Sequence, residues 1–356
     1  MKRALLLLCC LSPAVALAQP KVEPVGELRS NFVLERLDDL YTETPDAEPE
    51  VYLNISRAAV GAKVRFTDAI SGKVIVDVHE ARGAATYSTA GNDQVTISDS
   101  ESGYEARVLD AHARWRSATL GELTFGVQKS AFGVRRSYDT SDGFYFGPMD
   151  RQRSFAVRSG VVAPRVVGLA WQKGFGDRVD ATLMANNTTS FTTPESRNGK
   201  DVSAVVEYWA MPDTLRFTAS GMVGPRGEAG DAYETTQIAW AGAAYAKLGK
   251  LRALGEVFSR YLGEQTGLGY HAGLGGDVGL SGSLDHLEIL GRYESWEPDF
   301  DVDDDGYAML AGASNLYWAS PEKSTVMTGL LYEVTIPQDL NQAIAHSAIV
   351  QARLKF

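Results

Sequence analysis

The sequence predicts an all-β fold, a transmembrane antiparallel β-barrel of about sixteen strands. Three observations predict it: side chains that alternate between apolar and polar, the lack of a long apolar stretch after residue 18, and a closing strand that ends on an aromatic residue. In residues 251–261 the charged side chains Arg252, Glu256 and Arg260 share one parity, and the other parity is mostly apolar or small. A period of two gives a strand one lipid face and one aqueous face, whereas a helix would scatter these charges.

The closing strand shows the same pattern up to the last residue. Counting back from Phe356, residues 354, 352, 350 and 348 are apolar or small, and residues 355, 353, 351 and 347 are polar. Only Ile349 interrupts the alternation. Aromatic residues near the strand ends predict a girdle at the two membrane interfaces: Trp115, Trp171, Tyr208, Trp209, Trp240, Tyr293, Trp296, Tyr317, Trp318 and Tyr332.

The first eighteen residues predict a secretory signal peptide. Lys2 and Arg3 precede a short apolar run, and the small-residue triplet 16–18 predicts cleavage before Gln19. The apolar run is too short to span a bilayer as a helix. We therefore expect residues 1–18 to be removed and residues 19–356 to form a single barrel domain.

Cysteine content and charge exclude several classes of function. Cys9 and Cys10 both fall in the signal, so the mature chain has no thiol for a disulfide, a metal site or catalysis. The net charge is −11, and loss of Lys2 and Arg3 makes it −13, which argues against nucleic acid as a partner. Because no later stretch approaches about 18 consecutive apolar residues, only a closed barrel would satisfy the backbone in lipid.

Sixteen segments with strand-like alternation follow, with residues 166–186 taken as one strand plus a loop. Short turns and long polar loops separate them in turn, which is typical of bacterial outer-membrane barrels. A chain that starts and ends at the periplasmic rim needs an even number of strands. The segments are residues 27–38, 51–67, 73–82, 104–117, 121–128, 154–162, 166–186, 202–210, 215–223, 235–248, 251–261, 268–280, 284–296, 307–319, 325–336 and 343–356.

Four short motifs occur in a characteristic order. Residues 56–63 contain an arginine, alternating apolar residues and a lysine, and residues 120–128 form a segment that leads to a loop, with Val127 where arginine is common. Residues 137–152 form that loop and contain three aspartates among aromatic residues. Residues 155–159 form the segment that returns from the loop and contain Arg158. With the terminal Phe356, this order resembles the Gram-negative general-porin family over nearly the whole mature chain. The resemblance implies a homotrimer of barrels whose third external loop folds inward to narrow the pore.

The resemblance also implies a constriction in which acids on the loop face bases on the wall, across a strong transverse field. Arg57 and Arg158 are the basic candidates that the resemblance supplies, and inward parity adds Lys63, Arg65, Arg114 and Arg116. The acidic candidates are Asp139, Asp142 and Asp150. The implied function is an outer-membrane porin, a water-filled channel for passive diffusion of ions and small hydrophilic solutes. It would contact outer-membrane lipids and lipopolysaccharide and need no cofactor.

Three other functions stay open. The arginines could form binding sites in a substrate-selective anion or carboxylate channel, the barrel could be non-conducting and serve adhesion or envelope structure, or the chain could be a soluble periplasmic β protein. We do not expect an enzyme, because the histidines lie in separate strands without ligand spacing and no stretch resembles a nucleophile motif.

One acidic segment is a candidate calcium loop. Residues 301–306 place Asp301, Asp303 and Asp305 at the first, third and fifth positions of such a loop, with Gly306 at the sixth. The twelfth position is Gly312 instead of the glutamate that completes the site. The default interpretation is a solvated acidic loop, and a milder one is bridging to divalent-loaded lipopolysaccharide.

Overall fold

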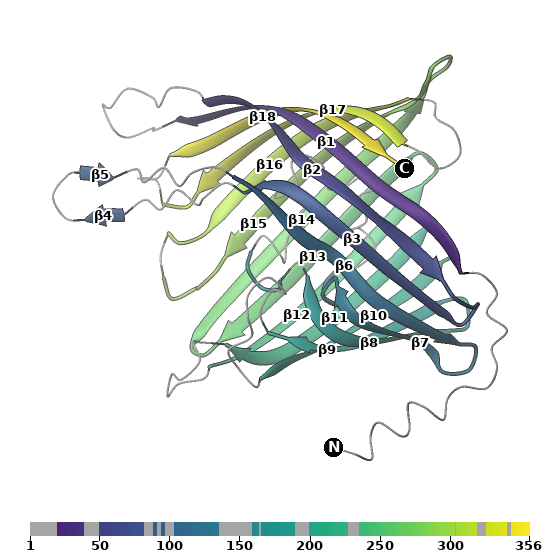
Figure 1. Cartoon of the computed structure of the whole chain (residues 1–356). Helices are drawn as coiled ribbons and strands as arrows, with labels where there is room; N and C mark the ends of the chain where they lie inside the picture. Colours follow the sequence, from purple (N-terminus) through teal and green to yellow (C-terminus); the bar gives the residue numbers. More distant parts are fainter. Residues whose placement is uncertain are drawn as a thin grey trace.

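The computed structural model is a closed antiparallel barrel whose strands tilt around a wide interior (Figure 1). It describes residues 20–38, 50–81, 88–90, 94–96, 103–134, 159–163, 165–188, 199–226, 235–302, 304–318, 325–339 and 343–356. Each barrel strand pairs with its neighbours along the chain, and β1 pairs with β18 to close the sheet. Closure gives every described strand of the barrel a partner on both sides, which is the arrangement that a backbone in lipid requires.

Sixteen strands form the barrel, and β4 (Ser88–Ala90) and β5 (Gln94–Thr96) form a separate hairpin. The barrel strands are β1 Lys21–Asp38, β2 Glu50–Arg65, β3 Ile70–Ala81, β6 Gly103–Ser117, β7 Gly121–Gln128, β8 Val166–Phe175, β9 Val179–Asn187, β10 Lys200–Met211, β11 Leu215–Arg226, β12 Thr235–Leu248, β13 Leu251–Leu262, β14 Gln265–Gly279, β15 Leu284–Glu297, β16 Tyr307–Trp318, β17 Thr325–Pro337 and β18 Ile344–Lys355.

The predicted barrel and its strand number are confirmed. Two segment assignments were wrong, and their effects on the strand count cancel. Residues 166–186 form two spanning strands, β8 and β9, joined by a turn in which Gly176 has a φ of 67°. Residues 159–162, the described end of the predicted strand 154–162, form a turn around Gly160, which has a φ of 70°. The buried Ser159 and Val161 flank the exposed Gly160. This turn therefore has the same alternation of buried and exposed residues as a strand.

The connections define two rims. Short turns at residues 66–69, 118–120, 176–178, 212–214, 249–250 and 280–283 lie at one end, which we call the short-turn rim, together with Phe356. The longer connections lie at the other end, the long-loop rim, although β13 and β14 are joined there by only Gly263 and Glu264. The predicted asymmetry of the two rims thus holds, with this one exception among the described connections.

Phe356 completes the closure of the barrel. Its backbone exchanges two hydrogen bonds with Gly26 of β1, with N···O distances of 2.8 and 3.0 Å. Its ring fills the space where a side chain on Gly26 would stand. A side chain on residue 26 would displace that ring, so the glycine and the terminal aromatic fit as a pair.

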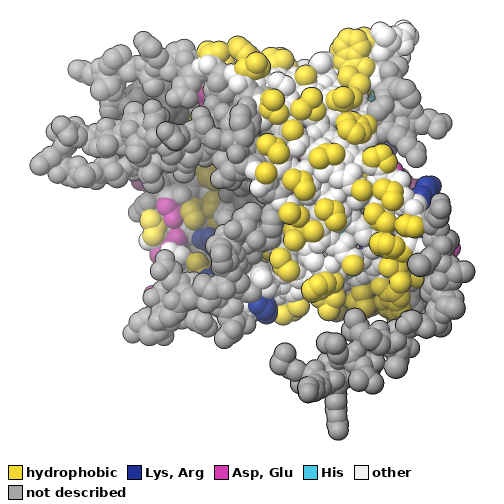
Figure 2. Space-filling view, in the orientation of Figure 1, with side chains coloured by type: hydrophobic (Ala, Val, Ile, Leu, Met, Phe, Trp, Pro, Cys, Tyr) yellow, Lys and Arg dark blue, Asp and Glu magenta, His cyan; other side chains and the backbone are white. Residues whose placement is uncertain are grey.

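Apolar side chains are spread over the face of the barrel in Figure 2, and each barrel strand carries an exposed large hydrophobic side chain. Outward side chains such as Val60, Phe125 and Leu274 are 63–69% exposed. Their strand neighbours point inward and include many charged groups, so the predicted alternation is realised in space. In the described part of the chain, no helix is long and apolar enough to cross a membrane.

Candidate functional site

The connection between β7 and β8 enters the barrel. Its two described ends, residues 129–134 and 159–163, contact inward-facing side chains of the opposite wall. The Gly133 amide donates to Ser220 Oγ at 2.9 Å, and the Val134 amide donates to Glu256 Oε1 at 3.1 Å. The Gln237 side-chain amide donates to the Val161 carbonyl at 2.8 Å. Both described ends of this connection therefore lie inside the barrel, and we call these two segments, residues 129–134 and 159–163, the inward loop.

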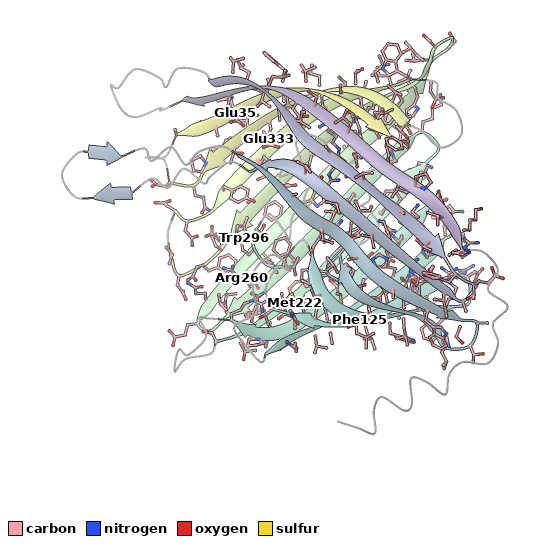
Figure 3. The ribbon with its side chains drawn as sticks, viewed as in Figure 1. Glu35, Phe125, Met222, Arg260, Trp296 and Glu333 are labelled. Atoms are coloured by element: carbon pink, nitrogen blue, oxygen red, sulfur yellow. The ribbon has the colours of Figure 1, made fainter. Side chains whose placement is uncertain are left out.

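Apolar packing holds the inward loop against the wall. Phe132 and Val161 are each 1% exposed and pack in one cluster with Phe258, Trp296 and other residues of β11 to β15. Phe258 and Trp296 stack with ring centroids 5.1 Å apart. Figure 3 shows Trp296 inside the barrel. The prediction that Trp296 belongs to an interfacial girdle was therefore wrong, because its ring supports the loop.

A second apolar cluster explains the interruption in the closing strand. Ile349 is fully buried on the inner side, with its paired residues Val33 and Leu331. The same cluster includes Val134 of the inward loop and Leu254 of β13. An apolar residue at an inward position thus marks a place where side chains pack against one another inside the barrel and exclude water.

Charged side chains line the inner faces of β18, β1 and β2 on the short-turn side of this apolar cluster. Arg29 of β1 is directly paired with Arg353 of β18 and with Arg57 of β2, so three guanidinium groups stand at one level. We call them the arginine cluster. Glu27 lies among them, with an ion pair to Arg29 and distances of 2.7 Å to Arg353 and 3.4 Å to Arg57. Arg57 also lies 3.5 Å from Asp77.

Of the predicted basic residues, Arg57 lies in the arginine cluster. Lys63, Arg65, Arg114 and Arg116 also face inward, but they stand near the short-turn rim around a recess of about 470 Å³. Arg158 and the acidic candidates Asp139, Asp142 and Asp150 lie outside the described residues, so an acidic side facing the arginines stays a prediction.

Arg29 and Arg353 were missed from the sequence, although a signal was present. Arg353 has the polar parity of the closing strand, and Arg29 has the parity of Glu27 in the first strand. What joins them is the pairing of β1 with β18, which brings the two ends of the chain together. Aligning these two strands at closure would have predicted the pair.

Ion pairs continue along the inner wall from β10 to β17. Arg216 lies 3.2 Å from Glu207, and Arg292 lies 3.0 Å from Glu294 and 3.4 Å from Glu333. These groups are less than 10% exposed, and each buried charge has at least one partner of opposite sign. This part of the wall also holds Tyr317, which stacks on His286 and donates to Glu288, so Tyr317 is not an interfacial girdle residue.

The calcium candidate gains no support. Asp301 and Asp305 lie in the connection between β15 and β16, and Asp303 is outside the described residues. Among the residues that the structure describes, no group of three His, Cys, Asp or Glu side chains could hold a metal ion.

Comparison with solved structures supports the barrel architecture. Similar folds include OprB of Pseudomonas putida (TM-score 0.63, 10% identity, covering 94% of each chain) and an anion-selective porin from Comamonas acidovorans (0.61, 13%, covering 95% of this chain and 100% of that one). OmpF of Salmonella typhi, in complex with daunomycin, is another (0.59, 12%, 94% and 98%). No protein-family model matches the sequence, and no curated protein matches it. The chain therefore has the barrel fold of outer-membrane porins.

Proposed function

We propose that the chain forms a water-filled channel in an outer membrane, for passive diffusion of ions and small hydrophilic solutes. The observation that carries this proposal is the inward loop, which is anchored to one wall while the arginine cluster stands on another. An apolar exterior suits the barrel to lipid, and a charged interior suits it to water. A loop that occupies part of the interior narrows the remaining path and keeps permeating solutes near charged side chains.

The arginine cluster favours a second candidate, a channel selective for anions or carboxylates. Three guanidinium groups share the nearby Glu27, and Arg57 has Asp77 as well. Arg29 and Arg353 are only 0% and 6% exposed, so the cluster would act on a permeating anion through its positive field, and Arg57 is its most exposed member. The similar Comamonas protein is named an anion-selective porin, which agrees with this candidate but does not decide it.

Planar-bilayer recordings test both candidates. A general channel should conduct in proportion to salt concentration, whereas a selective channel should saturate and be blocked by its solute. Folded protein that gives no conductance would refute both and favour the non-conducting barrel.

The reversal potential in a salt gradient tests the arginine cluster. The double variant Arg57→Gln/Arg353→Gln should shift permeability towards cations, while Arg29 still neutralises Glu27. The control Arg226→Gln removes a cation from β11, where it pairs with Asp201 at 2.7 Å. Equal reversal potentials for wild type and the double variant would exclude these arginines from the permeation path.

Further proposals rest on the sequence resemblance and the signal pattern. We propose a homotrimer in the outer membrane that contacts lipopolysaccharide, exported through cleavage before Gln19 into a single-domain mature chain of residues 19–356. Mass spectrometry of the protein from outer-membrane fractions tests the cleavage site. Analytical ultracentrifugation in detergent tests the trimer, and a monomeric species would contradict it.

A further inference from the structure

We propose that the inner wall beside the short-turn rim holds a binding site for a small multivalent oxyanion of the phosphate class. The site is the recess of about 470 Å³, which we call the basic recess. It is lined by residues of β1, β2, β3 and β6 and of the turn 66–69, at the short-turn end of these strands. Its cationic lining comprises Lys21, Lys63, Arg65, Lys73, Arg114 and Arg116.

The strand register places like charges directly opposite each other in this recess. Lys21 of β1 is paired with Arg65 of β2, and Lys63 of β2, which has Glu23 of β1 as its partner on one side, is paired with Lys73 of β3 on the other. Like charges at directly opposed positions destabilise a sheet. Two such pairs side by side are a local conflict of the kind that folded proteins keep at functional sites, where a ligand relieves the repulsion.

The acids in the neighbourhood neutralise only part of this charge. Lys73 lies 2.5 Å from Asp110, and Glu122 serves both Arg114, at 3.0 Å, and Arg116, at 2.9 Å. One carboxylate therefore answers two guanidinium groups.

Three cations of the recess have no such partner. Lys21, Lys63 and Arg65 make no ion pair with any described residue, although Glu23 and Asp68 also line the recess. All three are solvent-exposed, so a solute in the recess can reach them. These three cations, on β1 and β2, are therefore the ones that a ligand can reach without displacing an ion-pair partner.

This arrangement selects the chemistry of the ligand. A monovalent anion could neutralise only one of the three unmatched cations, whereas a phosphate-bearing anion offers several oxygens and more than one charge. The arginine fork can bind two of those oxygens, and the lysines act as point charges on the others. Because the side chains face the interior of the barrel, the ligand is a solute and not a lipid headgroup.

The basic recess lies near one mouth of the proposed channel. Its role as a binding site along the permeation path rests on that proposed function. Binding itself needs only the folded barrel. Calorimetry on the detergent-solubilised full chain can therefore detect the site even if recordings show no conductance, which distinguishes failure of this proposal from failure of the channel proposal.

The test is titration of the folded protein with inorganic pyrophosphate at about 0.1 M salt, where exposed charges are screened beyond about 10 Å. We expect one site per chain, and affinity for acetate at least about tenfold weaker, because acetate carries a single charge. The variant Lys63→Gln/Arg65→Gln should weaken pyrophosphate binding at least about tenfold, because it removes two charge-assisted contacts.

The matched control is Lys247→Gln/Lys250→Gln. These lysines are exposed at the same rim, at the turn between β12 and β13, and do not line the recess. The control removes the same charge and should bind pyrophosphate within about twofold of wild type. Heat-dependent gel mobility verifies that each variant is folded. Absence of pyrophosphate binding, equal weakening in both variants, or acetate binding as tight as pyrophosphate binding would each overturn the proposal.

Discussion

Removing the ring of Phe132 should loosen the inward loop without disturbing the barrel. Phe132 belongs to the loop, not to a strand, and is 1% exposed among Val161, Phe258 and Trp296. Phe→Ala substitutions in such surroundings cost about 3–5 kcal/mol. Because the docked loop bears that cost, the ratio of undocked to docked loop should rise by about two to three and a half orders of magnitude.

Single-channel recording measures this change. If the inward loop narrows the path, Phe132→Ala should raise the mean conductance and the open-channel noise. The matched control is Phe125→Ala, which deletes the same ring from the neighbouring strand β7, where it is 63% exposed on the outer face (Figure 3). We expect the control to conduct as wild type. A folded Phe132→Ala protein with unchanged conductance and noise would refute the reasoning that the loop sets the width of the path.

Two further substitutions test the wall. Glu27→Gln removes the carboxylate that three arginines share, and it should lower the free energy of unfolding by about 3 kcal/mol, measured by urea titration in lipid vesicles. The same substitution should shift the reversal potential towards anion selectivity. Unchanged values of both quantities would contradict the described ion pairs. Gly61→Ala places a Cβ against the Val74 carbonyl oxygen and should lower the free energy of unfolding by about 1–3 kcal/mol. The control Gly242→Ala places its Cβ in open space and should leave the free energy of unfolding nearly unchanged. Equal stability of the two variants would show that β2 and β3 can separate locally.

The barrel could be predicted from alternation because lipid and water impose it on every spanning strand. Alternation cannot distinguish a side chain that faces lipid from one packed against a loop inside the barrel, since both are apolar. The segment 154–162, of which the structure describes residues 159–162, was therefore taken as a strand, and Ile349 as an irregularity. The strand number was nevertheless right, because residues 166–186 hold one more strand than was assigned there.

The sequence predicted that basic side chains line the inner wall, but it did not predict how deep along the barrel each of them lies. Arg57 followed from the family resemblance, and the inward-facing bases at the short-turn rim followed from parity, which fixes the side of the wall on which a residue stands. Depth along the barrel depends on register, which is set between strands and is not visible within one of them. For this reason Arg29 and Arg353 became neighbours of Arg57 only when β18 met β1.

The pairing of the first strand with the last has a consequence for biogenesis. The side chains of Gln351 and Asn31, joined at 2.9 Å, lie 320 residues apart in sequence, so this seam can form only after almost the entire polypeptide has been delivered to the membrane. A product truncated before β18 would expose the free margins of β1 and β17, and such margins recruit other chains into aggregates. With the proposed outer-membrane location, periplasmic chaperones and proteases should therefore discriminate between complete and incomplete translation products at this one junction.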